Sequence, residues 1–460
     1  MAADKRYKKR KRKGRLIGKI IAGLVSVLVI CIAGGVFMKI GLPAILNEKD
    51  SGSVPMGDSS IKTSAQPVDG LQEPVVVSND TDASGDTQIP VSSELGAEKR
   101  SPEEIERDCE LWVDEQLSRM GMNDKAAQLF FVAVDTLTQV ENTTIAGDTY
   151  RERFDRFPVG GIVLLDGNIV SPDQLKSLTG TAREISGERV GTDLFVGVEE
   201  EGGRVLQIAD KPEFELNDVG SMTDIGAGDD AEAAFRAGDY IGSYLSEYGI
   251  NVDFAPVADL ISDTPNSVVE GRAFGRDSNL VSDMVSKEVE GLKKWNVSAV
   301  LKHFPGHGTT EGNPAEGDAV SYETQTELET FDYIPFRKGI DAGADFVMVG
   351  HITMKTMGQE LPASLSSYFM TDILKNDWGY DGIIITDDMS MAAISNRLSL
   401  ADAAVMAINA GADMVFVKSD FEAAIQGVIE AINEGEISTE RIDESVRRIL
   451  RIKYMKYYNR

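Results

Sequence analysis

Eight short β-rich runs separated by helical patterns constrain the fold of this 460-residue chain more than any other feature. Strands that alternate with helices pair in parallel, and eight such units within about 350 residues fit a closed barrel better than an open sheet. We therefore predict an α/β fold, a (β/α)8 barrel of the TIM type, over residues 101–460. The predicted strands are 128–134, 161–165, 194–198, 250–256, 297–302, 346–349, 382–386 and 414–417.

The N-terminal region predicts a membrane anchor. Residues 20–38 are 19 consecutive uncharged residues, which suffice for most of a hydrocarbon core of roughly 30 Å at 1.5 Å per helical residue. Residues 1–15 carry nine Lys and Arg, which the positive-inside rule keeps in the cytoplasm. We therefore predict a transmembrane helix within 16–46, a single-pass protein of the cell membrane, and a barrel outside the cytoplasm. A cleaved signal peptide is the alternative.

The segment 47–100 predicts a disordered linker. It is rich in Ser, Asp, Gly, Pro and Thr, and no aromatic residue occurs between Phe37 and Trp112. Such a segment buries too little apolar surface to offset its chain entropy. Ser101, followed by Pro102 and by Glu104 at the third helical position, predicts a capped helix start.

The charge distribution argues against nucleic acid as a partner. Of the 46 basic and 75 acidic residues, the part after residue 15 holds 37 and 74. An acidic body of this kind repels phosphate backbones. The two cysteines cannot form a disulfide framework.

Histidines mark the carboxyl ends of predicted strands, which meet at one mouth of a barrel. The chain has three: His303 and His307 in the run Lys302 to Gly308 (KHFPGHG), and His351 after the sixth strand. The alternative for His307 and His351 is a structural role, in which neighbouring backbone groups bond them. Because no strand end shows a set of His and carboxylate ligands, we predict no metal and no organic cofactor.

Carboxylates also follow two of these strands. Asp387 and Asp388 follow the seventh strand; Asp388 is the better helix-cap candidate, which leaves Asp387 facing the mouth. The run Glu199 to Arg204 (EEEGGR) follows the third strand, and its glycines suit either close approach to a ligand or a plain turn.

These motifs together resemble a known family. The runs from Glu201 to Val205, Gly271 to Phe274, Lys302 to Gly308 and Thr386 to Met391 are similar to those of the catalytic domain of glycoside hydrolase family 3, in particular its bacterial β-N-acetylhexosaminidases. The resemblance extends over about residues 108–456, and the KHFPGHG run is its most specific part.

The resemblance implies a retaining mechanism in which Asp387 attacks the anomeric carbon and forms a glycosyl-enzyme intermediate. It also implies that Arg272, Lys302 and His303 bind sugar hydroxyls in the terminal subsite, together with Glu199. The expected reaction is hydrolysis of terminal β-linked N-acetylglucosamine from a glycan or muropeptide of cell-wall origin. A β-glucosidase-like specificity is the nearest rival.

The chain departs from the family pattern at the proton donor. Relatives carry a histidine general acid, held by an aspartate two residues earlier, where this chain has Ala315 and Asn313. Alanine donates no proton, and general acid catalysis contributes roughly 10² to 10⁴ in rate. Glu199 also stands where the family usually has aspartate, and Gln207 where it commonly has arginine.

Three hypotheses follow from this departure. Another acid on the same loop could protonate the leaving oxygen: Glu311, Glu316 or Asp318, given a pKa raised by burial. Alternatively the barrel is a sugar-binding pseudoenzyme at the cell surface, or a scaffold without a ligand.

Overall fold

The computed structural model describes residues 100–263, 266 and 268–459. The predicted cytoplasmic segment 1–15, the anchor 16–46 and nearly all of the linker 47–100 lie outside the described residues. No helix within the described part is both long and apolar enough to cross a membrane.

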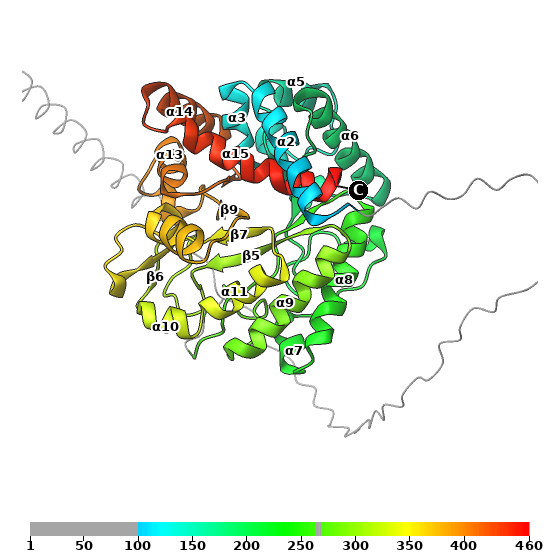
Figure 1. Ribbon diagram of the computed structural model, residues 1–460. Coiled ribbons are helices and arrows are strands. Elements are labelled where there is room, and N and C mark those ends of the chain that lie inside the picture. The colour runs from blue at the N-terminus through cyan, green and yellow to red at the C-terminus, as the bar shows by residue number, and fades with distance from the viewer. Residues whose placement is uncertain (1–99, 264–265, 267, 460) are drawn as a thin grey trace, which may run out of the picture. The chain divides into compact units, whose positions relative to one another are not determined.

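A parallel eight-stranded sheet forms the centre of the described fold (Figure 1). Its strands follow the order β10-β1-β2-β3-β4-β5-β7-β9. All eight coincide with the predicted runs, so the barrel prediction is confirmed. The strands are β1 (Phe130–Ala133), β2 (Gly161–Val163), β3 (Phe195–Val198), β4 (Val252–Asp253), β5 (Ser298–Phe304), β7 (Phe346–Val349), β9 (Ile383–Thr386) and β10 (Val415–Val417).

The sheet curves until its two outer strands meet. Ile385 at β9 forms a single parallel bridge with Met414, just before β10. The N–H of Thr386 donates to the carbonyl of Met414 at 3.1 Å, and the N–H of Phe416 donates to the Thr386 hydroxyl at 3.1 Å. These bonds nearly close the barrel.

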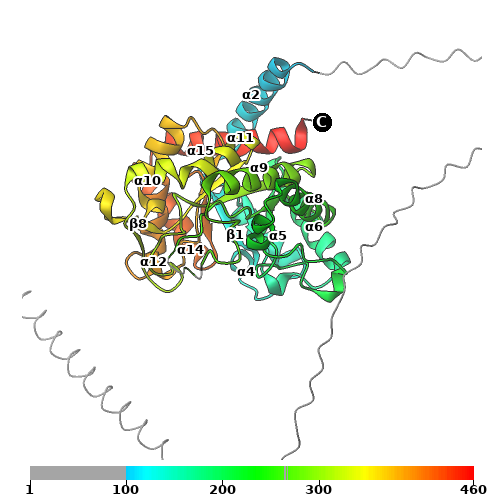
Figure 2. The ribbon, with the colours of Figure 1, turned by 90° about the horizontal axis from the view of Figure 1, so that it is seen from below.

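Helices follow the strands and cover the outside of the barrel (Figures 1 and 2). Most begin at a Ser, Thr or Asp whose side chain accepts a backbone N–H, as capping requires. The helices are α2 (Pro102–Arg119), α3 (Met122–Gln128), α4 (Val134–Thr138), α5 (Asp148–Arg156), α6 (Pro172–Val190), α7 (Met222–Ala227), α8 (Ala231–Glu247), α9 (Ser278–Lys294), α10 (Gln325–Thr330), α11 (Tyr333–Ala342), α12 (Ala392–Ser395), α13 (Leu400–Ala410), α14 (Phe421–Glu434) and α15 (Thr439–Lys453).

Helices α2 and α15 lie side by side across the amino-terminal end of the barrel in both views (Figures 1 and 2). The predicted start of α2 is confirmed, because Ser101 and Glu104 form a reciprocal capping box. At the end of α15, the Nζ of Lys453 donates to Gln128 at 3.0 Å. These contacts close the end opposite the strand carboxyl termini.

Aromatic rings fill the barrel interior below the mouth. Phe131 and Phe254 pack edge to face at a centroid distance of 5.2 Å, and Phe254 stacks on Phe416 at 5.0 Å. Gly161 and Gly197 make room for them, since a Cβ at either position would come within 2.8 Å of the Phe131 ring. These packed side chains fill the interior of the barrel, so that space for a ligand is left only at its mouth.

A small two-stranded sheet stands beside the mouth. It pairs β6 (Ala319–Ser321) with β8 (Ile352–Met354) in parallel. The N–H of Glu311 donates to the carbonyl of Val320 at 2.7 Å, which ties the loop after β5 to this sheet. Residues 311–320, which include Asn313 and Ala315, are therefore held at both ends.

Candidate active site

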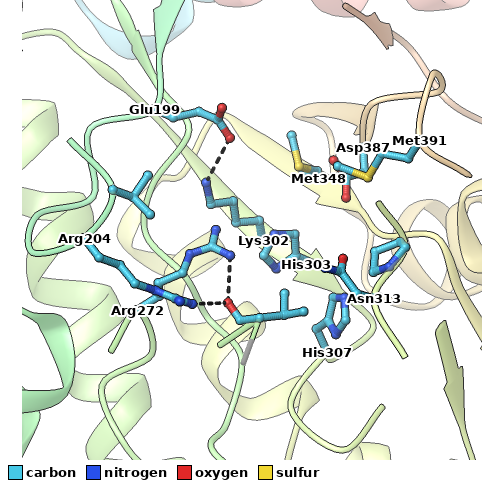
Figure 3. A pocket seen from close by; sticks show the side chains of 13 residues that line it. Glu199, Arg204, Arg272, Lys302, His303, His307, Asn313, Met348, Asp387 and Met391 are labelled. Atoms are coloured by element: carbon cyan, nitrogen blue, oxygen red, sulfur yellow. Dashed lines mark hydrogen bonds and ion pairs between the residues drawn. The ribbon is translucent and has the colours of Figure 1, made fainter. Parts of the chain in front are cut away.

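A cavity of about 360 Å³ opens at the carboxyl ends of the strands (Figure 3). That size falls in the range of roughly 300–1,000 Å³ typical of small-ligand sites. The cavity brings together all five predicted site residues, which come from β5, from the positions just after β3 and β9, and from the loop between β4 and α9. Its lining is Glu199, Arg204, Val205, Val268, Arg272, Lys302, His303, His307, Asn313, Pro314, Met348, Asp387 and Met391.

A buried ion cluster supports one side of the cavity. The Lys302 ammonium lies 2.5 Å from Glu201, and the Arg272 guanidinium grips the same carboxylate through two bonds of 2.7 and 2.6 Å. Burial alone would raise the pKa of Glu201, but Lys302 and Arg272 lower it to about 2. Glu201 therefore stays ionised and fixes both cations in direction.

Arg272 keeps donors for a ligand. Its Nη1 also donates to the carbonyl of Val268 at 2.9 Å. A guanidinium carries five N–H groups, so three are bonded within the protein and two remain. Those two can reach hydroxyl oxygens in the cavity.

Two lysines flank Glu199. Its Oε2 lies 3.0 Å from the Nζ of Lys418, and its Oε1 lies 3.9 Å from the Nζ of Lys302. Burial opposes ionisation of Glu199, but the charges of Lys418 and Lys302 outweigh it and lower the pKa of Glu199. Glu199 thus presents a carboxylate to the cavity.

His303 is oriented by a buried aspartate. Its Nδ1 lies 2.7 Å from Asp259, which also accepts the backbone N–H groups of His303 and His307. The peptide bond between Lys302 and His303 is cis. Fixing Nδ1 against a carboxylate leaves Nε2 as the ring atom available to a ligand.

His307 lies fully buried beside His303, with ring centroids 5.5 Å apart. Its Nδ1 is 2.6 Å from the Thr310 hydroxyl, while its Nε2 has no hydrogen-bond partner among the described residues. Burial, followed by the charge of His303, lowers the pKa of His307 to about 4. His307 is therefore a neutral imidazole near neutral pH.

Asp387 follows β9 and is held by backbone. Its N–H donates to the carbonyl of Val349 at 3.0 Å, and its Oδ1 accepts the N–H of Asp388 at 2.7 Å. Burial would raise the pKa of Asp387, but His351, His303 and this N–H lower it below its usual value. The result is an ionised carboxylate facing the pocket in Figure 3.

His351 and Asp388 support the loop that carries Asp387. His351 is fully buried, with Nε2 donating to the carbonyl of Asp388 at 2.9 Å and Nδ1 at 2.7 Å from Ser364. The prediction that Asp388 caps a helix is wrong, because α12 begins only after Met391. Asp388 instead accepts the N–H groups of Ser390 and Lys418, which braces the loop below Asp387.

The loop after β5 brings amide and apolar groups to the cavity. Asn313 and Pro314 line it, and the N–H of Ala393 donates to the carbonyl of Pro314 at 3.0 Å. The three acids proposed as replacement donors, Glu311, Glu316 and Asp318, are exposed and do not line the cavity.

The loop acids also have other partners. Asp318 pairs with Arg397, and Glu316 accepts the Asn313 amide at 3.4 Å. The structure thus does not bring a replacement acid from this loop to Asp387. Among the described residues, no three His, Cys, Asp or Glu side chains are grouped in a way that could hold a metal ion.

Comparison with known proteins gives the family. Residues 121–452 match the model of the glycosyl hydrolase family 3 N terminal domain. The chain belongs to glycosyl hydrolase family 3. This match covers most of the chain and includes every residue of the candidate active site.

Individual relatives agree with the family match. A beta-hexosaminidase of Nitrosomonas eutropha is 29% identical over 335 residues, covering 70% of this chain and 93% of that protein. Beta-hexosaminidase LpqI of Mycobacterium tuberculosis is 30% identical over 343 residues, covering 73% and 83%. The solved family 3 beta-N-acetylglucosaminidase of Paenibacillus sp. superposes with a TM-score of 0.67 at 32% identity, covering 73% of this chain but only 63% of that one.

Sequence reasoning missed two residues of the site. Asp259 and Lys418 both stand just past predicted strands, at 250–256 and 414–417. Inspecting the carboxyl end of every predicted strand would have found them, since all barrel strand ends converge on the mouth.

Proposed function

We propose that this chain hydrolyses terminal β-linked N-acetylglucosamine from glycans by a retaining mechanism, as a family 3 β-N-acetylhexosaminidase. One observation carries the proposal: an ionised Asp387 shares a sugar-sized cavity with Arg272, Lys302, His303 and Glu199. The names of the matched relatives, beta-hexosaminidase and beta-N-acetylglucosaminidase, support the substrate.

Binding comes before chemistry. The free N–H groups of Arg272, the Lys302 ammonium and the His303 ring offer donors to hydroxyl oxygens, and the Glu199 carboxylate accepts hydroxyl protons. The Glu201 carboxylate orients Arg272, and the Asp259 carboxylate orients His303. The sugar therefore binds to donors that are already in position. The ring is then held with its anomeric carbon toward Asp387.

The chemical step uses the Asp387 carboxylate as the nucleophile. One oxygen forms a bond to the anomeric carbon while the bond to the glycosidic oxygen breaks; the aglycone leaves with the electron pair and takes a proton from solvent, which gives a glycosyl-enzyme intermediate. Water then attacks the same carbon and releases Asp387. Two displacements retain the β configuration.

We also propose that the enzyme acts outside the cytoplasm, anchored in the cell membrane by a helix within 16–46, on cell-wall glycans or muropeptides. The support is the sequence pattern alone: nine basic residues in 1–15 before an uncharged run at 20–38. Cell fractionation and protease treatment of intact cells test this. A membrane-bound barrel that external protease cleaves is expected; a soluble or protected barrel contradicts the proposal.

The function is tested with 4-nitrophenyl β-N-acetylglucosaminide and the matching β-glucoside. We expect cleavage of the first, little of the second, and a β-configured first product by NMR. Asp387→Asn should reduce kcat by at least ~10⁴. Saturable sugar binding without any cleavage would instead favour a sugar-binding protein, and an inverted product would exclude Asp387 as the nucleophile.

A further inference from the structure

The two sides of the cavity differ in chemistry (Figure 3). Glu199, Arg272 and Lys302 gather on one side, and Figure 3 shows Asp387, Met391 and Asn313 on the other. A sugar whose hydroxyls face the ionic side places its anomeric carbon at Asp387. The leaving group then departs beside Asn313, Pro314 and Met391, an amide and two apolar side chains.

No carboxyl group lining the described cavity is protonated at neutral pH. Asp387 and Glu199 both have their pKa lowered, by neighbouring imidazoles in the first case and by Lys418 and Lys302 in the second, against the opposing effect of burial. A general acid needs a proton to give and a pKa near the working pH. Neither carboxylate meets that condition.

The histidines of the cavity do not replace a carboxylic acid. His307 is neutral, since burial lowers its pKa to about 4, and its Nδ1 is engaged by Thr310. His303 directly follows Lys302 in β5, its Nδ1 is engaged by Asp259, and the resemblance to family 3 assigns it to binding sugar hydroxyls. An imidazole in that position contacts the ring rather than the leaving oxygen.

The acids on the loop after β5 cannot act as the general acid from their positions in the structure. Glu311, Glu316 and Asp318 point to solvent, outside the cavity, and the Asp318 side chain is 51% exposed in its ion pair with Arg397. Exposure removes the burial that raises a carboxyl pKa. In the described structure the side chains placed beside the departing oxygen, Asn313, Pro314 and Met391, therefore include no general acid.

We propose that this site cleaves β-N-acetylglucosaminides whose aglycone leaves as a weakly basic anion, such as a phenolate, much faster than glycan linkages whose leaving group is an alcohol. This inference rests on the proposed function. Asp387 bonds to the anomeric carbon, the bond to the phenolic oxygen breaks, and its electron pair stays on the phenolate without proton transfer. Water then displaces Asp387 from the carbon and gives its proton to solvent.

An anion that carries no proton should replace water in the second step. Azide attacks the anomeric carbon of the intermediate through nitrogen, the bond to Asp387 breaks, and the carboxylate is regenerated. The product is the β-glycosyl azide. Because this attack requires no general base, it bypasses the step that water must complete unaided.

The experiment compares kcat/KM for a series of aryl and alkyl β-N-acetylglucosaminides with the full chain. We expect phenyl and alkyl glycosides to be cleaved at least ~10²-fold more slowly than the 4-nitrophenyl glycoside, the rate that a general acid would otherwise supply. Azide should raise kcat for the 4-nitrophenyl substrate and yield the β-glycosyl azide. Equal rates across the series, or no azide product, overturn the inference and leave the proposed function standing.

Single variants test whether another residue donates a proton to the leaving oxygen. Glu311→Gln, Glu316→Gln and Asp318→Asn should each leave the ratio between 4-nitrophenyl and phenyl substrates unchanged, and His303→Asn should slow both alike. A variant that slows only the phenyl substrate identifies a general acid and overturns the inference. Failure to cleave any member of the series overturns the proposed function itself.

Discussion

The Nζ of Lys418 lies 3.0 Å from the Oε2 of Glu199, although 219 residues separate them. Lys418 is fixed along its length: its N–H donates to Asp388, its carbonyl accepts the Thr136 hydroxyl, and its ammonium lies over the Phe416 ring. The Glu199 side chain reaches this cation. Lys418 thus supplies a positive charge beside the Glu199 carboxylate.

Lys418→Met should lower activity at acidic pH, because it changes the ionisation of Glu199 and Asp387. Lys418 lowers the pKa of both carboxylates, so its loss raises their pKa values and moves the acid limb of the kcat/KM profile to higher pH. We expect kcat/KM to fall ~10- to 100-fold near pH 5, and less at neutral pH. The surface variant Lys176→Met, which loses an exposed pair with Glu247, should leave the profile unchanged. An unmoved acid limb in Lys418→Met would remove Lys418 from the site.

Glu288 makes stability depend on pH. This α9 residue is buried, neither carboxylate oxygen has a hydrogen-bond partner among the described residues, and burial followed by the charge of Glu201 raises its pKa from 4.5 to about 8. Between these two pKa values Glu288 binds a proton in the folded state but not in the unfolded state. This proton binding stabilises the folded state fully below about pH 4.5, and the stabilisation is lost as the pH rises through about 8.

Glu288→Gln tests this dependence by chemical denaturation at about pH 5 and about pH 8. The free energy of unfolding of the wild type should fall with pH by up to ~1.4 kcal/mol per unit more steeply than that of the variant. Glu290→Gln, which alters an exposed pair with Lys287 on the same helix, should retain the wild-type slope. Equal slopes for wild type and Glu288→Gln would show that Glu288 ionises normally.

Gly308, the last residue of the KHFPGHG run, is required by a close backbone approach. A Cβ there would stand 1.6 Å from the carbonyl oxygen of Leu260. Gly308→Ala must displace one of the two loops that hold Asp259 and His303, so we expect a loss of ~2–4 kcal/mol in stability and of most activity. Gly317→Ala, in open space on the same loop, is the matched control in thermal denaturation. Similar melting temperatures for the two variants would contradict this account.

Restoring the family dyad should change the dependence on the leaving group. The double variant Asn313→Asp with Ala315→His places a carboxylate at a position that lines the cavity and an imidazole at the exposed position two residues later, next to Pro314, which also lines the cavity. We expect the phenyl substrate to gain at least ~10-fold in kcat/KM while the 4-nitrophenyl substrate changes little. An unchanged ratio would show that residue 315 does not face the leaving oxygen.

Much of the fold was predictable because the physical signals are local. Each barrel strand, such as 383–386, is a short apolar run bounded by turn residues, and alternation with helices fixes parallel pairing. The pair β6 and β8 was not predicted, since runs such as 319–321 lie inside loops and take no part in the alternation of strands and helices that marks the barrel.

The site was predicted less completely than the fold. Asp387 and Lys302 were found at the ends of predicted strands, whereas Arg272 was found only through the resemblance to glycoside hydrolase family 3. Lys418 and Asp259 act through partners distant in sequence, and a single lysine after a strand gives no sign of its partner. The exposure of Glu311 likewise depends on how the loop pairs with Val320, which sequence spacing does not reveal.

Mass spectrometry of the enzyme quenched during turnover of 4-nitrophenyl β-N-acetylglucosaminide tests the central claim most directly. Because water attacks the intermediate without a general base, the glycosyl-enzyme should accumulate. We predict one N-acetylhexosamine on the peptide that contains Asp387, absent in Asp387→Asn and discharged by azide. Turnover with no sugar on Asp387, or with the sugar on another residue, would contradict the account.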